Sequence, residues 1–304
     1  MLRLIPDNTS IKFVRLKLMA FVASLVLALI SIIAVIFIGL NLGIDFRGGI
    51  LIEVRTENID ISDLRLEVSN LEIGEVSIQE FGSSTDFLIR VERQQGTDKA
   101  QQVAVEKIKN KLNNTFSNKI EYRRLEFVGP TVSKDLVQKG ILAIFFAVIA
   151  MLAYIWFRFE LPFAMGAVIA LIHDVVLTLG VFSIVGLEFN LATVAAILLI
   201  IGYSMNDTVV VYDRVRENLR KFKKMNFEEL IDKSVNETLA RTINTTATTI
   251  LALLALYFLG GQIISDFAFA MLWGIIVGTY SSIFIASTIL TFLNVRSYSE
   301  KKEN

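Results

Sequence analysis

An aspartate near the end of a long apolar run is the residue with the clearest chemical potential in this sequence. Asp207 lies in the string GYSMNDTVVVYDRVREN, residues 202–218, directly after the apolar run Leu191–Tyr203. A carboxylate inside a membrane is costly unless it is paired or protonated, so a chain that keeps one there is a candidate for moving charge across the membrane. The alternative interpretation is a structural ion pair, or an interfacial side chain that reaches water.

Two neighbours and one cation extend this candidate site. Asn206 and Ser204 form a polar patch beside Asp207, which favours a water-accessible or bundle-facing position. Arg241 opens the next apolar segment, RTINTTATT, at a similar depth, and Thr245 is one of several hydroxyls that follow it. Arg241 would favour the charged form of Asp207. It is equally compatible with a topology anchor whose neighbouring hydroxyls pack between helices.

A second carboxylate lies in the middle of another apolar stretch. Asp174 follows His173, the only histidine, about twelve residues into this stretch. An imidazole exchanges protons near neutral pH, so His173 is a candidate proton relay, although a lone histidine is commonly a packing residue with one hydrogen bond. On the last apolar segment, Gly274, Gly278 and Ser282 place small residues four apart, which predicts close helix packing.

Six long apolar stretches must position these residues. Of the 304 residues 54% are apolar, and the 30 basic and 30 acidic residues gather in blocks between the stretches. Each stretch is near or above the roughly 18–20 residues that cross a hydrocarbon core of about 30 Å. The first is longer than the apolar part of a signal peptide, so we expect it to remain as an anchor. The sequence therefore predicts a polytopic α-helical membrane protein with transmembrane helices at 18–42, 137–157, 161–185, 190–212, 241–261 and 266–294.

The basic residues predict an orientation for these helices. Outside the long segment 43–136, basic residues lie before the first helix, between the second and third, after the fourth and after the sixth. The turns between the third and fourth helices and between the fifth and sixth contain no Lys or Arg. Basic loops favour the cytoplasmic side. We therefore expect a cytoplasmic N-terminus (1–17), connector (213–240) and tail (295–304), both termini inside, and a periplasmic segment at 43–136. Within the connector, Asn226 is expected to cap an amphipathic helix that lies along the inner face.

The segment 43–136 alternates between strand and helix patterns. The expected elements are a strand at 49–56, a helix at 61–71, strands at 75–81 and 86–92, a helix at 99–116 and a strand at 120–128. This order, β-α-β-β-α-β, is that of a ferredoxin-like fold. The segment contains no catalytic cluster that we can identify, and a docking or hinging role is the interpretation we favour.

Several classes of chemistry have no support in the sequence. There are no cysteines, which excludes disulfides, thiolate metal sites and thiol catalysis. We find no nucleotide-binding loop, no nucleophile with a base and no metal-ligand spacing. The net charge is zero, which implies no bulk attraction to nucleic acid. We therefore expect no hydrolytic enzyme, no cofactor and no metal.

Several strings along the chain resemble the SecD/SecF family of bacterial protein-export membrane proteins, within the resistance–nodulation–division superfamily. They are GIDFRGG (43–49), ALIHDVV (170–176), GYSMNDTVVVYDRVREN (202–218), RTINTT (241–246), and DFAFAML with GTYSSIFIAS toward the end. Their order, with six predicted spans and one outer domain, is similar to the smaller subunit of that family over nearly the whole chain.

The resemblance implies a role in protein export across the bacterial inner membrane, driven by the proton-motive force. It implies SecD as the paired subunit, the SecYEG channel and the translocating preprotein as contacts, SecA as an indirect partner, and YajC and YidC as further associates. In the family, the residues at the positions of Asp207 and Arg241 are implicated in proton passage, and the role carries over less directly to Asp174. Some relatives use sodium, and one carboxylate could serve either ion.

Two alternatives remain open. A half-transporter of the same superfamily, exporting a lipid or small molecule, would share the fold and the proton site, although such exporters usually carry twelve helices in one chain. A non-transporting scaffold of the translocon would use Asp207 and Arg241 only as a structural pair. Co-purification with a SecD-like partner tests the first alternative. The second predicts that neutralising these charges lowers complex abundance without uncoupling export from the gradient.

Overall fold

The computed structural model describes residues 9–57, 59–71, 73–74, 76–81, 83–94, 98–116, 119–293 and 295. The chain divides into two compact units. One comprises residues 1–41, 142–187 and 192–304, and the other comprises residues 42–141 and 188–191. The first eight residues and, apart from residue 295, the expected cytoplasmic tail lie outside the described residues.

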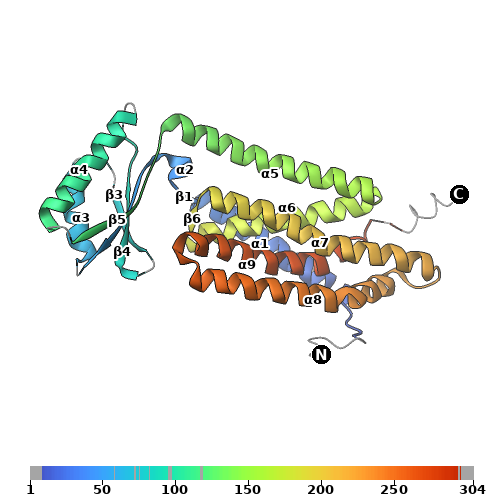
Figure 1. Cartoon of the computed structure of the whole chain (residues 1–304). Coiled ribbons are helices and arrows are strands. Elements are labelled where there is room, and N and C mark those ends of the chain that lie inside the picture. Colours follow the sequence, from blue (N-terminus) through green and yellow to red (C-terminus); the bar gives the residue numbers. More distant parts are fainter. Residues whose placement is uncertain are drawn as a thin grey trace. The chain divides into compact units, whose positions relative to one another are not determined.

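The first unit is built from long helices (Figure 1). Six helices in the described part of the chain are long and apolar enough to cross a membrane, which confirms the predicted number. Their helical bounds are α1 (Lys17–Phe37, preceded by the turn η1, Val14–Leu16), α5 (Pro130–Arg158), α6 (Leu161–Val185), α7 (Leu191–Lys221), α8 (Phe227–Leu259) and α9 (Gly261–Ser281), the last continued by the π-helical turn η2 (Ser282–Ala286) and by α10 (Ser287–Ile289).

Helix α8 differs from the expected connector. The structure has one uninterrupted helix where we expected a separate amphipathic helix on the inner face followed by a membrane helix from 241. Asn226 does cap it, with its side chain accepting from the backbone N of Glu228 at 2.8 Å. No Pro or Gly interrupts residues 227–259, so nothing ends the helix before the membrane segment. The apolar face is also not free to lie on lipid, because Leu230 and Ile231 are fully buried.

Small residues let the helices of the first unit approach closely. A Cβ atom on Gly180 of α6 would lie 2.1 Å from Oγ of Ser31 on α1, and one on Gly274 of α9 would lie 2.3 Å from Cδ1 of Ile200 on α7. Gly278 meets Ser204 in the same way, at 2.9 Å. Lipid gives no hydrophobic drive to helix association, so such close backbone packing is a main source of it. The predicted packing role of the α9 glycines is confirmed.

The second unit consists of the α+β insertion between the first and second membrane helices together with residues 188–191. Its elements are β1 (Asn41–Leu42, starting in the first unit), α2 (Ile44–Arg47), β2 (Gly49–Thr56), α3 (Ile61–Ser69), β3 (Val76–Phe81), β4 (Ser83–Val91), α4 (Asp98–Phe116), β5 (Ile120–Val128) and β6 (Glu188–Phe189). Four strands form an antiparallel sheet in the order β3-β4-β2-β5. With α3 and α4 on one face (Figure 1), this is the predicted ferredoxin-like arrangement.

The two faces of strand β2 bury different side chains. Ile50, Ile52 and Val54 point toward α3 and α4 and belong to the main core of the unit. Leu51, one residue out of phase, joins Ile44 of α2 in a smaller cluster on the opposite face. A strand alternates its side chains between faces, so the sheet is covered by helices on one side and by the segment before β2 on the other.

An ion pair between β2 and β4 predicts how the second unit responds to acid. Nε and Nη2 of Arg55 donate to the two carboxylate oxygens of Asp86 at 2.6 and 2.8 Å, and this bond lowers the pKa of Asp86 to about 2. The folded pKa lies below the unfolded value of about 3.9, so the stabilisation is complete above about pH 5 and is lost as the pH falls toward 2. We expect Asp86→Asn to lower the unfolding free energy by about 1 kcal/mol at pH 7, because Arg55 is partly exposed.

Hydrogen exchange of the β2 and β4 amides in the full-length protein measures this effect. The difference between Asp86→Asn and the parent is expected to shrink as the pH is lowered from 5 to 3. A difference that stays constant over that range would show that the ion pair does not set it.

Candidate functional site

Three helices of the first unit meet at a buried carboxylate. Asp174 on α6 is 1% exposed, and its Oδ2 accepts hydrogen bonds from the hydroxyls of Ser204 on α7 at 2.6 Å and of Ser281 on α9 at 2.8 Å. Oδ1 lies 3.0 Å from Nδ1 of His173. A carboxyl group in an apolar interior needs such partners. Here they come from three elements, so Asp174 ties together the helices that surround it.

The polar network continues between α7 and α9. Thr208 and Ser282 share a hydrogen bond at 2.8 Å, and the hydroxyl of Ser282 also donates to the carbonyl of Ser204 at 3.3 Å. Ser282 begins the π-helical turn η2, a distortion that often marks functional sites. Neither Ser281 nor Thr208 is among the residues predicted from the sequence. Their only signals were the Ser-Ser pair in GTYSSIFIAS and the four-residue spacing from Ser204.

Only one ring nitrogen of His173 has a hydrogen-bond partner in the described part of the chain. Its Nδ1 faces Asp174, and its ring lies 6.2 Å from that of Tyr280 on α9. Its other nitrogen, Nε2, is buried and has no hydrogen-bond partner among the residues that the structure describes. A buried polar atom of this kind calls for an explanation, and a proton-exchange role is one of the accepted ones. The structure thus shows a contact of His173 with the predicted carboxylate Asp174.

Asp207 lies one helical turn beyond Ser204 on α7. It is 4% exposed, and its Oδ2 has no hydrogen-bond partner in the described part of the chain. Arg241 acts on it electrostatically, but no hydrogen bond between the two side chains accompanies this interaction. Arg241 itself is exposed at the surface of the unit. The arrangement therefore differs from a closed salt bridge, because the carboxylate has a cation in range and an oxygen still free to bond.

The remaining predicted residues are not part of either carboxylate's contacts. Asn206 is exposed, because the next position on a helix points about 100° away from Asp207. The hydroxyl of Thr245 donates to the carbonyl of Arg241 on its own helix at 3.0 Å, and its carbonyl accepts from the hydroxyl of Tyr203 at 3.3 Å. Of the predicted supporting residues, Ser204 and His173 directly contact a predicted carboxylate, in both cases Asp174.

Buried carboxyl groups in this arrangement are suited to binding and releasing a small cation such as a proton. Two buried carboxyl groups, Asp174 and Asp207, lie on neighbouring helices and are linked through Ser204 and its own turn of α7. Ionisable groups inside membrane helices mark ion pathways by default. The described residues contain no group of three or more metal-ligating side chains.

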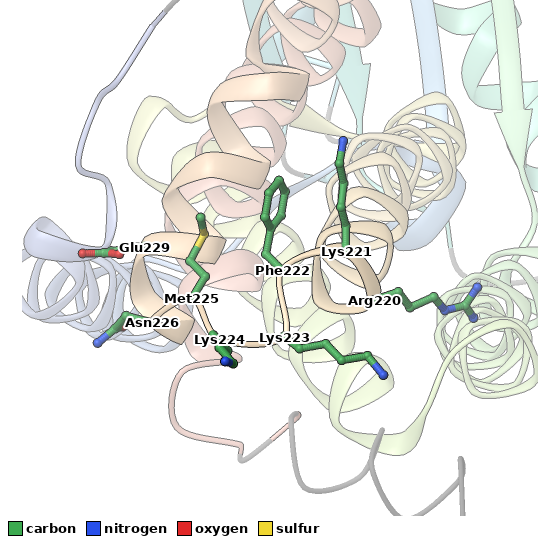
Figure 2. Close-up of a pocket in the computed structure, with 8 residues that line it drawn as sticks. All are labelled: Arg220, Lys221, Phe222, Lys223, Lys224, Met225, Asn226 and Glu229. Atoms are coloured by element: carbon green, nitrogen blue, oxygen red, sulfur yellow. The ribbon is translucent and has the colours of Figure 1, made fainter.

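A basic pocket at the turn between α7 and α8 has a different character. It has a volume of about 740 Å³ and is lined by Arg220, Lys221, Phe222, Lys223, Lys224, Met225, Asn226 and Glu229. Figure 2 shows Arg220 and Lys223 extending to the same side, with Glu229 pointing to the opposite side. Four cations within five residues suit the inner side of a membrane.

Comparison with known proteins places this geometry in a family. The family model "Protein export membrane protein SecD/SecF, C-terminal" matches residues 107–296, and the SecD/SecF GG motif matches residues 33–58. Protein translocase subunit SecF of Rickettsia rickettsii is 47% identical over 99% of this chain and 97% of its own length. The subunit of Rickettsia prowazekii is 46% identical over 99% of this chain and 96% of its own length.

Two solved structures share the fold. The crystal structure of SecDF from Thermus thermophilus, described as a translocon-associated membrane protein, matches 96% of this chain with a TM-score of 0.84 and 33% identity. A SecDF structure in a super-membrane-facing form matches 98% with a TM-score of 0.67 and 31% identity. This chain spans 40% of each of those longer chains. Its sequence and its fold thus agree, and the chain belongs to the SecD/SecF family of protein-export membrane proteins.

Proposed function

We propose that this chain pairs with a SecD-type subunit and uses the proton-motive force to promote late stages of protein export across the inner membrane. As a member of its family it is a multi-pass membrane subunit of the protein translocase. The observation that supports the proposed energy coupling is Asp207. It is a buried carboxylate on a membrane helix, with one oxygen unpartnered among the described residues and with Arg241 in electrostatic range.

A polar surface on α7 and α8 supports pairing with another membrane subunit. Asn206, Arg241, Asn244 and Thr248 are exposed on the helices that carry the proposed proton site. Polar side chains at membrane depth are costly in lipid and face a bundle interior or a water-filled path. A second subunit of the same family would cover this surface and enclose Asp207. The SecDF relative, in which the matching portion is 40% of a longer chain, is consistent with such a partner.

The proposed orientation places both termini and the α7–α8 turn in the cytoplasm, and the α+β insertion in the periplasm. The cations of the basic pocket support it, because basic residues next to membrane helices favour the cytoplasmic side. In this orientation the insertion is available to a preprotein that leaves a SecYEG channel after SecA has acted. The further associations with YajC and YidC rest on the family resemblance alone.

Cells depleted of this chain provide the test. Export of a secreted reporter is measured with and without a protonophore, before and after the chain is restored, and the tagged chain is purified to ask which subunits accompany it. We expect restoration to add a component of export that the protonophore removes, together with co-purification of a SecD-type subunit. A restored component that resists both a protonophore and a sodium ionophore would contradict the proposal. A component that a sodium ionophore removes and a protonophore does not would change only the ion.

The same experiment separates the two alternatives. A half-transporter of a lipid or small molecule predicts no SecD-type partner and no change in export of the reporter. A scaffold predicts that export follows the amount of assembled translocon and is insensitive to the gradient at constant amount.

A further inference from the structure

The end of the α6–α7 connection and the first residue of α7 belong to the same unit as the inserted domain. Residues 188–191 belong to the second unit, together with residues 42–141. Leu191 is also the first residue of α7, the helix that carries Asp207. Contacts that hold this short segment therefore act on the start of that helix through the chain itself.

The segment just before β2 supplies the backbone contacts. Strand β6 (Glu188–Phe189) pairs with β1, and the backbone N of Gly43 donates to the carbonyl of Phe189 at 2.9 Å. Asp45 then caps α7, with its Oδ2 accepting from the backbone N of Leu191 at 3.0 Å. The first turn of a helix has unsatisfied N–H groups, so this carboxylate stabilises the position at which α7 begins.

An ion pair connects the same segment to the sheet. Nη2 of Arg90, on β4, contacts Oε2 of Glu188, and both side chains are 16% exposed. Burial raises the pKa of Glu188, and the nearby Arg90 opposes that effect. Each partner thus depends on the other, because removal of one leaves a buried charge without compensation.

This arrangement explains why the first residue of the GIDFRGG string, Gly43, is a glycine. A Cβ atom on Gly43 would lie 2.4 Å from Oε1 of Glu188 and 3.2 Å from Cβ of Asn190. A side chain at this position would force the Glu188 carboxylate to shift and would crowd Asn190. The string therefore supplies both a close approach, at Gly43, and a helix cap, at Asp45.

We propose that Asp45, Arg90 and Glu188 form a latch that fastens the inserted domain to the first residue of α7, so that the domain and the helix carrying Asp207 move together. The inference rests on the proposed function, since it describes how an event at Asp207 reaches the domain outside the membrane. The three are positioning residues, because they act through the start of α7 and touch no proton-carrying group of the membrane helices in the described structure.

A charge exchange tests the latch in cells that depend on this chain. We expect R90E and E188R each to reduce the protonophore-sensitive component of export by about 5-fold or more, the lower range of allosteric coupling, at normal levels of the chain. The double variant R90E/E188R is expected to restore the pair and most of that component. K111E, which breaks the ion pair of Lys111 with Glu67 between α4 and α3, is the matched control and should leave export unchanged.

A second variant keeps the test decisive if the charge exchange affects folding. Asp45→Ala removes the cap on Leu191 without burying a charge, and we expect it to reduce the same component at normal abundance. The latch is overturned if all three single variants export like the parent, or if export falls only in step with the amount of chain. A parent whose export resists both a protonophore and a sodium ionophore would overturn the proposed function and the latch with it, whereas a sensitive parent with unaffected variants overturns the latch alone.

Discussion

Cells that carry Asp207→Asn are expected to lose the component of protein export that depends on the proton gradient, while gradient-independent export continues. Asparagine has nearly the shape of aspartate, so the packing around α7 is retained, but it neither takes up nor releases a proton at neutral pH. One charge that crosses 100 mV is worth about 2.3 kcal/mol. That energy shifts a two-state equilibrium by about 50-fold, so its loss removes most of the bias that a gradient can supply.

The measurement is export of a secreted reporter with and without a protonophore, with the membrane levels of the chain and its partner checked in the same cells. Asp213→Asn is the matched control, because Asp213 lies on the same helix but is paired with Arg158 at 2.9 Å and is partly exposed. We expect the control to export like the parent. Normal gradient-dependent export in Asp207→Asn would mean that the carboxylate is structural, and the scaffold alternative would then be preferred.

Asp174→Leu is expected to destabilise the association of α6 with α7 and α9. The substitution leaves the hydroxyls of Ser204 and Ser281 and Nδ1 of His173 without their acceptor in a buried site. Hydrogen bonds between membrane helices contribute about 0.6 kcal/mol each on average, so the two from Ser204 and Ser281 account for about 1 kcal/mol. The thermal unfolding of the purified chain in detergent measures the loss, and reduced amounts of the chain in the membrane are expected to accompany it.

Asp174→Asn separates the structural from the electrostatic role of this residue. The amide keeps an acceptor oxygen, so the chain should unfold close to the parent temperature, and any loss of gradient-dependent export then reports on the charge or the proton. Thr178→Val is the control, because Thr178 is as buried as Asp174 but its hydroxyl donates within its own helix, to the carbonyl of Asp174 at 2.8 Å. If Asp174→Leu unfolded at the parent temperature, the network would not hold the helices together.

The elements of this protein were predictable because they follow from local patterns. Strands β2 and β5 have the predicted bounds, and α6 coincides with the predicted third span. The alternation of apolar and polar residues in a strand and the long apolar run of a membrane helix involve only neighbouring residues. Both patterns are therefore visible in the sequence without the structure. The helices α5 and α7 exceed the predicted spans, because a hydropathy pattern marks what lies in lipid and not where helical hydrogen bonding stops.

The candidate site was predictable only in part. Asp207, Asp174 and Arg241 are conspicuous in sequence because charges interrupt apolar runs, and the structure buries both carboxylates. The helix face on which a polar residue lies depends on packing, and Asn206 is exposed although it precedes a buried aspartate. Ser281 contributes a hydroxyl to Asp174 from a position 107 residues away, a contact that no local pattern contains.

Sequence by itself determined the class of protein, the number and order of its membrane helices, the fold of its inserted domain and the residues able to carry charge. Tertiary structure alone decided how those residues are joined. It brought Ser204 and Ser281 to Asp174, left Asp207 without a direct bond from Arg241, and placed residues 188–191 in the same unit as Arg90. The reason is physical. Hydropathy and periodicity are summed over neighbours along the chain, whereas hydrogen bonds and ion pairs between helices depend on atoms that only folding brings within 3 Å.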